Sequence, residues 1–116
     1  RRFKEVDITL QDLKDLWEKQ DGICTYTGLK LFLPTYNKCD YKVYYRASLD
    51  RIDSSKGYIK DNIQFVSTSI NYMKNTMTDL ETKQFLKLIL SYTSHFCEDE
   101  TISSLEERVS DAQAGN

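Results

Sequence analysis

The chain has 116 residues and a net charge of −2, which allows one domain with a single modest core and argues against a strongly basic nucleic-acid-binding protein. No apolar run approaches the roughly 20 residues that span a bilayer and no signal peptide is visible, so we expect no membrane partner.

The first half of the chain is predicted to hold a helix followed by short strands. Residues 9–20 have the spacing of an amphipathic helix, with Thr9 as its cap and Asp12 as a box-like partner three residues on. Residues 29–33 alternate as a short strand, and residues 43–50 alternate as a strand with one buried face. The apolar stripe expected to make the helix pack against the core is Leu10, Leu13, Leu16 and Trp17.

The second half is predicted to hold one more strand and two helices. Residues 63–66 form the strand, and Ser67 or Thr68 can cap a helix that runs to about Asn75. Asn71 and Lys74 are three apart and share one face of that helix. A capping box, Thr78-x-x-Glu81, begins a last helix over about 79–95, and residues 98–116 read as an acidic, flexible tail.

Charge and cysteine usage add two expectations. Residues 1–75 carry a net charge of +3 and residues 76–116 a net charge of −5, so the first part can attract phosphates or can present an ordinary solvated surface. The three cysteines, Cys24, Cys39 and Cys97, are odd in number and unpaired in spacing, which favours reduced thiols and an intracellular, soluble protein. Because the chain opens with Arg1-Arg2 rather than Met, we expect a piece of a larger protein or a trimmed chain.

A constellation of polar residues then points to chemistry. Asp50 ends a predicted strand, Asn62 precedes the next one, and Asn71 and Lys74 follow on a helix, all within about 25 residues. A carboxylate and an amide carbonyl are ligands that Mg²⁺ or Mn²⁺ accepts, and a lysine can lie beside a phosphate as a point charge. Asn62 is expected to tie the loop to the strand by side-chain to backbone hydrogen bonds. Each residue is weak evidence by itself, and the joint spacing carries the hypothesis.

The segments LDRID, GYIKDN and NYMKN resemble the HNH nuclease superfamily, with similarity over about 23–75 and closest to its phage and mobile-element branch. The resemblance implies an α+β protein with a ββα-metal core, flanked by the N- and C-terminal helices, that cleaves nucleic acid with a divalent cation. It implies that Asp50 and Asn71 are the metal ligands, that Asn62 is the structural asparagine of the motif, and that Lys74 is the cation at the end of the motif helix.

Two departures from the family pattern matter. The position directly after the metal Asp holds Arg51 where the family has a histidine base, and a guanidinium cannot accept a proton at neutral pH. Arg51 can clamp a phosphate instead, which leaves Asp53, Tyr58 or a hydroxide on the cation as substitute bases. The single histidine, His95, is far from the motif in sequence and is read as structural or surface. The scattered cysteines also lack the paired spacing of a zinc clasp, so we expect no zinc.

The leading hypothesis is therefore an HNH-type endonuclease domain over 1–97, dependent on Mg²⁺ or Mn²⁺, that hydrolyses phosphodiester bonds in DNA, or in RNA or single-stranded nucleic acid. Its expected catalytic residues are Asp50, Arg51, Asn62, Asn71 and Lys74. Its expected nucleic-acid contacts are Arg46, Arg51, Lys56, Lys60 and Lys74. The alternatives are a catalytically silent nucleic-acid-binding module, which Arg51 motivates, and an interaction domain with an accidental resemblance. One such site cuts one strand, so a double-strand break needs a dimer or sequential nicking.

Overall fold

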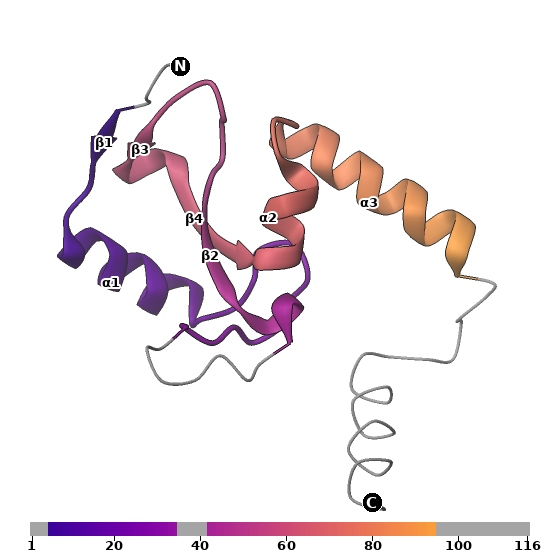
Figure 1. Ribbon diagram of the computed structural model, residues 1–116, viewed down its shortest axis with the longest axis horizontal. Helices are drawn as coiled ribbons and strands as arrows, with labels where there is room; N and C mark the ends of the chain where they lie inside the picture. The colour runs from indigo at the N-terminus through magenta and orange to yellow at the C-terminus, as the bar shows by residue number, and fades with distance from the viewer. Residues whose placement is uncertain (1–4, 35–41, 95–116) are drawn as a thin grey trace, which may run out of the picture. The chain divides into compact units, whose positions relative to one another are not determined.

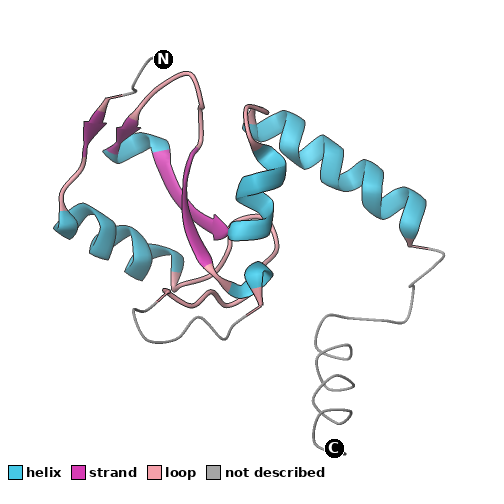
Figure 2. Cartoon of the chain, in the orientation of Figure 1, coloured by secondary structure: helices cyan, strands magenta, loops and turns pink. Residues whose placement is uncertain are grey.

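The computed structural model describes residues 5–34 and 42–94, and its architecture is α+β (Figures 1 and 2). These residues form three α-helices and two small sheets. The chain divides into two units, residues 1–83 and 84–116, and the elements below belong to the first unit unless stated otherwise.

The helix α1, Leu10–Gln20, begins at the predicted capping box. The Thr9 hydroxyl accepts a hydrogen bond from the Asp12 backbone N–H, and the Asp12 carboxylate accepts one from the Thr9 backbone N–H, both at 3.0 Å. These bonds satisfy two of the donors that a helix start leaves unpaired. The helix ends at Asp21 and Gly22, whose φ angles of 54° and 63° are left-handed and cannot continue it.

The principal sheet pairs β2, Ala47–Arg51, with β4, Ile63–Ser67, in an antiparallel register that sets Leu49 opposite Phe65 and Asp50 opposite Gln64. The predicted strand over 43–50 is correct only in its second half, because Val43–Tyr45 forms a 3₁₀ turn. In that turn the Tyr45 carbonyl accepts from the Phe32 backbone N–H, and the Phe32 carbonyl accepts from the Ala47 N–H.

The strand predicted over 29–33 is wrong. Within the described residues this segment makes two isolated bridges, Ile23 with Lys30 and Phe32 with Arg46, each to a different partner segment. Each bridge is a single residue pair that is not continued by its neighbours, so no ladder forms there.

The two faces of the β2–β4 pair carry different chemistry. One face holds Leu49 and Phe65, and the Phe65 ring meets the Trp17 ring of α1 edge to face with centroids 5.0 Å apart. The Gln20 side chain also bonds the backbone N–H and C=O of Phe65 at 2.7 and 2.9 Å, which satisfies the open edge of β4. The other face holds Asp50 and Gln64, so the polar site faces away from α1. The helices α1 and α2 lie on opposite sides of the β2–β4 pair (Figure 1).

The expected apolar stripe of α1 is only partly covered. Within the described residues no side chain of α1 is buried, and Leu10 is 67% exposed. The apolar core comes instead mostly from β4 and the segments beside it. Its buried apolar residues are Cys24, Leu31, Ile63, Phe65, Val66 and Ile70.

The helix α2, Thr68–Lys74, follows β4 directly, with Ser67 in the cap position. The predicted cap bond is absent. The Ser67 hydroxyl is buried and has no hydrogen-bond partner in the described chain, whereas the Thr68 hydroxyl donates to the Arg46 carbonyl. A strand therefore runs into a helix with no cap, and tertiary packing holds the junction.

The helix α3, Asp79–Thr93, begins at the predicted box. Thr78 and Glu81 exchange the two capping hydrogen bonds, at 2.9 and 3.1 Å. Its residues from 84 on belong to the second unit. None of the described helices is long and apolar enough to cross a membrane.

A second, two-stranded sheet was not expected. It pairs β1, Val6–Asp7, with β3, Tyr58–Ile59, in parallel, and the 3₁₀ turn Lys60–Asn62 leads from β3 into β4. Gly57 is required beside this sheet, because a Cβ there would collide with the Glu5 backbone.

Candidate functional site

Asp50 lies on β2 with its side chain in the interior, where the residue is 4% exposed. Its Oδ2 is 3.3 Å from the Lys74 ammonium and accepts a hydrogen bond of 2.9 Å from the Gln64 amide. Its Oδ1 accepts no hydrogen bond from the described residues. The carboxylate is thus held through one oxygen and keeps the other uncommitted.

Lys74 is fully buried on α2. Besides facing Asp50, its ammonium donates to the Arg51 carbonyl at 2.8 Å and to the Ile52 carbonyl at 3.4 Å. Burying a lysine is costly unless its charge is paired and its protons are bonded, and here all three partners are provided by β2 and the residue after it. This corrects the expectation that Lys74 contacts a phosphate, because its ammonium is turned into the domain.

Asn71 lies one turn earlier on the same face of α2, as its spacing from Lys74 predicted. Its amide Nδ2 donates to the Ser48 hydroxyl at 2.6 Å. Ser48 and Asp50 are two apart on β2 and share a face of the strand, so α2 lies along β2 with Asn71 on Ser48 and Lys74 on Asp50. The Asn71 Oδ1 accepts nothing from the described part of the chain.

Asn62 is buried and makes the tie between loop and strand that its position predicted. Its Oδ1 accepts from the Asp53 N–H at 2.9 Å, and its Nδ2 donates to the carbonyls of Asp53 and Gly57 at 3.0 and 2.9 Å. The three bonds close the loop between β2 and β3 on itself. Asn62 therefore shapes the loop and does not face Asp50.

Arg51 is committed to the same loop. Its guanidinium donates to the carbonyls of Ser54 and Lys56 at 3.0 and 3.2 Å, and its carbon lies 5.3 Å from the centroid of the Tyr58 ring. Arg51 is therefore a cation that binds the backbone of the loop and is not available as a proton acceptor. Tyr58, one expected substitute base, stacks on this cation.

Asp53, the other expected substitute base, is exposed at the loop. Hydrogen bonds from the side chain and then the backbone of Ser55 hold the pKa of the Asp53 carboxyl below its ordinary value. A carboxylate with a lowered pKa is a weaker proton acceptor, which makes Asp53 a poor candidate for activating water at neutral pH.

The predicted nucleic-acid-binding cations differ in exposure and in their contacts. Lys56 and Lys60 are exposed, and Arg46 is half-buried. Lys60 lies toward the start of α1, where its charge contributes slightly to the lowered pKa of Asp12. All three belong to the first unit, 1–83.

Sequence reasoning missed the residues that surround Asp50 from β4 and from the turn after α1. Gln64 is 8% exposed, and its amide bonds the Thr25 hydroxyl at 3.0 Å and the Tyr26 hydroxyl at 3.2 Å as well as Asp50. Tyr26 in turn donates to Asp79 at 2.5 Å. A glutamine between the apolar residues of a buried strand was a usable signal for Gln64, but no sequence pattern pointed to Tyr26 or Asp79.

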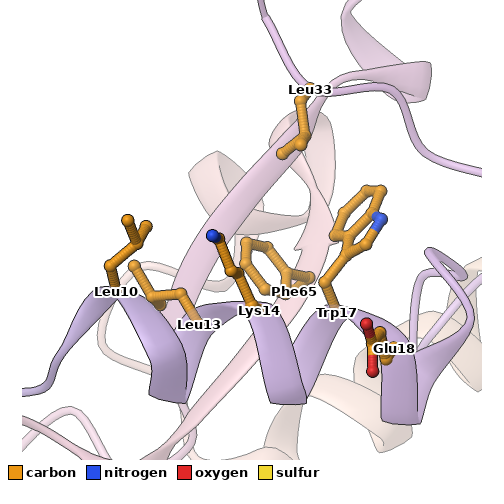
Figure 3. A pocket seen from close by; sticks show the side chains of 7 residues that line it. All are labelled: Leu10, Leu13, Lys14, Trp17, Glu18, Leu33 and Phe65. Carbon is orange, nitrogen blue, oxygen red and sulfur yellow. The ribbon is translucent and has the colours of Figure 1, made fainter.

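A cavity of about 420 Å³ lies on the opposite face of the sheet, between α1 and the segment of Leu33 (Figure 3). It contains none of the predicted site residues, and apart from Lys14 and Glu18 its lining is apolar, so we place the candidate site on the polar face. The residues that line the cavity are Leu10, Leu13, Lys14, Trp17, Glu18, Leu33 and Phe65.

The ligand set available for a cation is small. No group of three or more His, Cys, Asp or Glu side chains comes together within residues 5–34 and 42–94. The free oxygens of Asp50 and Asn71 are hard donors on one side of the sheet, which suits a cation that keeps several waters, as Mg²⁺ does. His95, Cys39, Cys97 and the tail lie outside the described residues.

Comparison with models of protein families, with curated proteins and with solved structures found no match.

Proposed function

We propose that this chain is a metal-dependent endonuclease of the HNH type, which hydrolyses phosphodiester bonds in DNA with one Mg²⁺ or Mn²⁺ held by Asp50 and Asn71. The observation that carries the proposal is the paired contact between α2 and β2. Lys74 and Gln64 contact one oxygen of Asp50, and Ser48 accepts from the amide nitrogen of Asn71. The Oδ1 of Asp50 and the Oδ1 of Asn71 accept no hydrogen bond from residues 5–34 and 42–94.

The order of elements supports a ββα-metal core. β2 carries Asp50, a loop closed by Asn62 leads to β4, and β4 runs directly into α2 with Asn71. The positions of Asp50, Asn62 and Asn71 in this order agree with what the resemblance implies for them. The buried network around Asp50 also agrees with a site whose ligand must be held in one orientation.

Each side chain then has a separable task. A divalent cation at this site, when bound, neutralises charge on the phosphate and stabilises the leaving oxygen. Asp50 and Asn71 would hold it, and the buried Lys74 would orient Asp50 through their ion pair. Arg51 holds the loop and cannot accept a proton, so a group other than Arg51 activates the water.

A catalytically silent nucleic-acid-binding module is the second candidate, and one observation favours it. The Arg51 guanidinium is fastened to two carbonyls and to the Tyr58 ring, so no base stands at the family's position. On this hypothesis the exposed Lys56 and Lys60 still contact phosphates. The two candidates differ in cleavage and not in binding.

The test is nicking of supercoiled plasmid with Mg²⁺, Mn²⁺ or EDTA. Asn71→Ala is the informative variant because Asn71 is only half-buried, whereas Asp50→Ala would leave the buried Lys74 unpaired and unfold part of the domain. Tyr72→Ala is the matched control, since Tyr72 is the adjacent residue and 76% exposed.

We expect metal-dependent nicking that falls at least about 100-fold in Asn71→Ala, because removing a ligand should cost more than the 10- to 100-fold of an outer-shell change. Tyr72→Ala should keep it. Unchanged nicking in Asn71→Ala would reject the metal role. DNA binding without cleavage under any metal would favour the silent module.

A further inference from the structure

Gln64 is a polar side chain in a strand whose five residues are all buried. Its amide uses both ends: Nε2 donates to the Asp50 Oδ2 at 2.9 Å and to the Tyr26 hydroxyl at 3.2 Å, and Oε1 accepts from the Thr25 hydroxyl at 3.0 Å. Such a satisfied, buried amide is costly to assemble and specifies one arrangement of its neighbours.

The hydrogen bonds in this network run in one direction. The Tyr26 hydroxyl donates to the Asp79 carboxylate at 2.5 Å, so its oxygen must accept from Gln64. Burial and then the bond to Asp79 raise the pKa of Tyr26, and the bond from Tyr26 lowers the pKa of Asp79. At neutral pH Tyr26 therefore keeps its proton, and the Asp79 carboxylate accepts the hydrogen bond.

This direction determines how Gln64 meets Asp50. If the amide were reversed, its oxygen would face the Asp50 carboxylate and the Tyr26 oxygen, which are both acceptors. With Tyr26 as acceptor, the Nε2 end must point at Asp50. The Asp79 carboxylate, at the first position of α3, thus acts on Asp50 through two intermediate side chains.

We propose that Tyr26 and Gln64 are positioning residues that hold the Asp50 Oδ2 inside the domain and present the Asp50 Oδ1 to the cation. Asp79 sets the direction of the hydrogen bonds that link these residues. The inference rests on the proposed function, because it assigns these residues a task at the same metal site. It also assigns a task to Asp79, which lies outside residues 23–75, the range over which the chain resembles a nuclease.

Tyr26→Phe is the discriminating variant, because it removes only the hydroxyl between Asp79 and Gln64. Tyr72→Phe makes the same chemical change at an exposed residue of α2 and is the control. The readouts are Mn²⁺ affinity, from the electron paramagnetic resonance signal of free Mn²⁺, and the dependence of plasmid nicking on metal concentration. A thermal unfolding curve of each variant measures its folded fraction.

We expect Tyr26→Phe to bind Mn²⁺ about tenfold more weakly, in line with other outer-shell changes, and Tyr72→Phe to bind it as the wild type does. Saturating metal should restore the maximal nicking rate of Tyr26→Phe, which a loss of folded protein would not allow. If Tyr26→Phe does not fold, Asp79→Ala provides the same test, because Asp79 is partly exposed and its loss leaves the Tyr26 hydroxyl without its acceptor.

Two outcomes would overturn the inference, and they are distinguishable. Wild-type affinity in a folded Tyr26→Phe would overturn the positioning role and leave the nuclease proposal intact. A wild-type chain that binds no Mn²⁺ at millimolar concentration would overturn the proposed metal site, and the positioning role with it.

Discussion

The ion pair between Lys74 and Asp50 should be one of the most sensitive points in the fold. The ammonium is 3.3 Å from the Asp50 Oδ2, and the two side chains are 0% and 4% exposed. Removing one partner of such a pair leaves a buried charge without compensation, which typically costs about 3–5 kcal/mol. We therefore expect Lys74→Met to lower the free energy of unfolding by about 3–5 kcal/mol, a large share of the roughly 5–15 kcal/mol of a small domain.

Lys83→Met is the matched control. Lys83 forms an ion pair of similar length with Asp79, 3.0 Å, but its side chain is 62% exposed. An exposed helix pair is worth about 0.3–0.5 kcal/mol, so this variant should be nearly as stable as the wild type. The two lysine-to-methionine changes therefore differ mainly in burial.

Urea unfolding followed by the fluorescence of Trp17 is the assay, because Trp17 is the single tryptophan and its ring packs on Phe65 of β4. The double variant Asp50→Leu with Lys74→Met completes a mutant cycle and should recover most of the loss, since removing both charges leaves no unpaired one. A loss below about 1 kcal/mol in Lys74→Met would refute the argument, since exposed pairs reach that value.

Three further outcomes are expected elsewhere in the domain. Asn62→Ala should cost about 2–3 kcal/mol in urea unfolding, because it removes three hydrogen bonds of a buried side chain, worth about 1 kcal/mol each. A cost below about 1 kcal/mol would contradict its role as the loop tie. Gly57→Ala should speed amide exchange in β1 and β3, because its Cβ collides with the Glu5 backbone; unchanged exchange would show that the strands can shift. Asp12→Ala should destabilise α1 at neutral pH, and the difference from wild type should vanish in acid. The pKa of the Asp12 carboxyl is lowered, mainly by the hydrogen bond from the Thr9 N–H. Its contribution to stability is therefore present above the ordinary carboxylate pKa and is lost as the pH falls through the lowered pKa. A difference in unfolding free energy that does not change with pH would contradict this.

Features built from residues three or four apart could be predicted from the sequence. The capping boxes of Thr9 with Asp12 and of Thr78 with Glu81 are present as predicted, because all their atoms lie within one helical turn. The shared face of Asn71 and Lys74 follows from helical spacing in the same way. The loop tie of Asn62 is also short in range, reaching back only to residues 53–57.

Alternation predicted the strands less well. Over 43–50 it could not show that Phe32, far away in the chain, bonds both Tyr45 and Ala47 and holds the first half in a turn. The paired strands β1 and β3 are two residues each, too short for a period to be visible. Their pairing depends on the approach of Glu5 to Tyr58, a contact between distant segments.

For the candidate site, residue types and spacing indicated which residues could act and on which elements they lie. Their surroundings depend on the folded arrangement, in which Lys74 is turned inward and Gln64 lies opposite Asp50 and donates to Tyr26. Burial and hydrogen-bond direction could not be predicted, because they depend on groups from separate segments meeting in space. A residue's type and spacing specify what it can donate or accept, while the fold specifies which partner it finds.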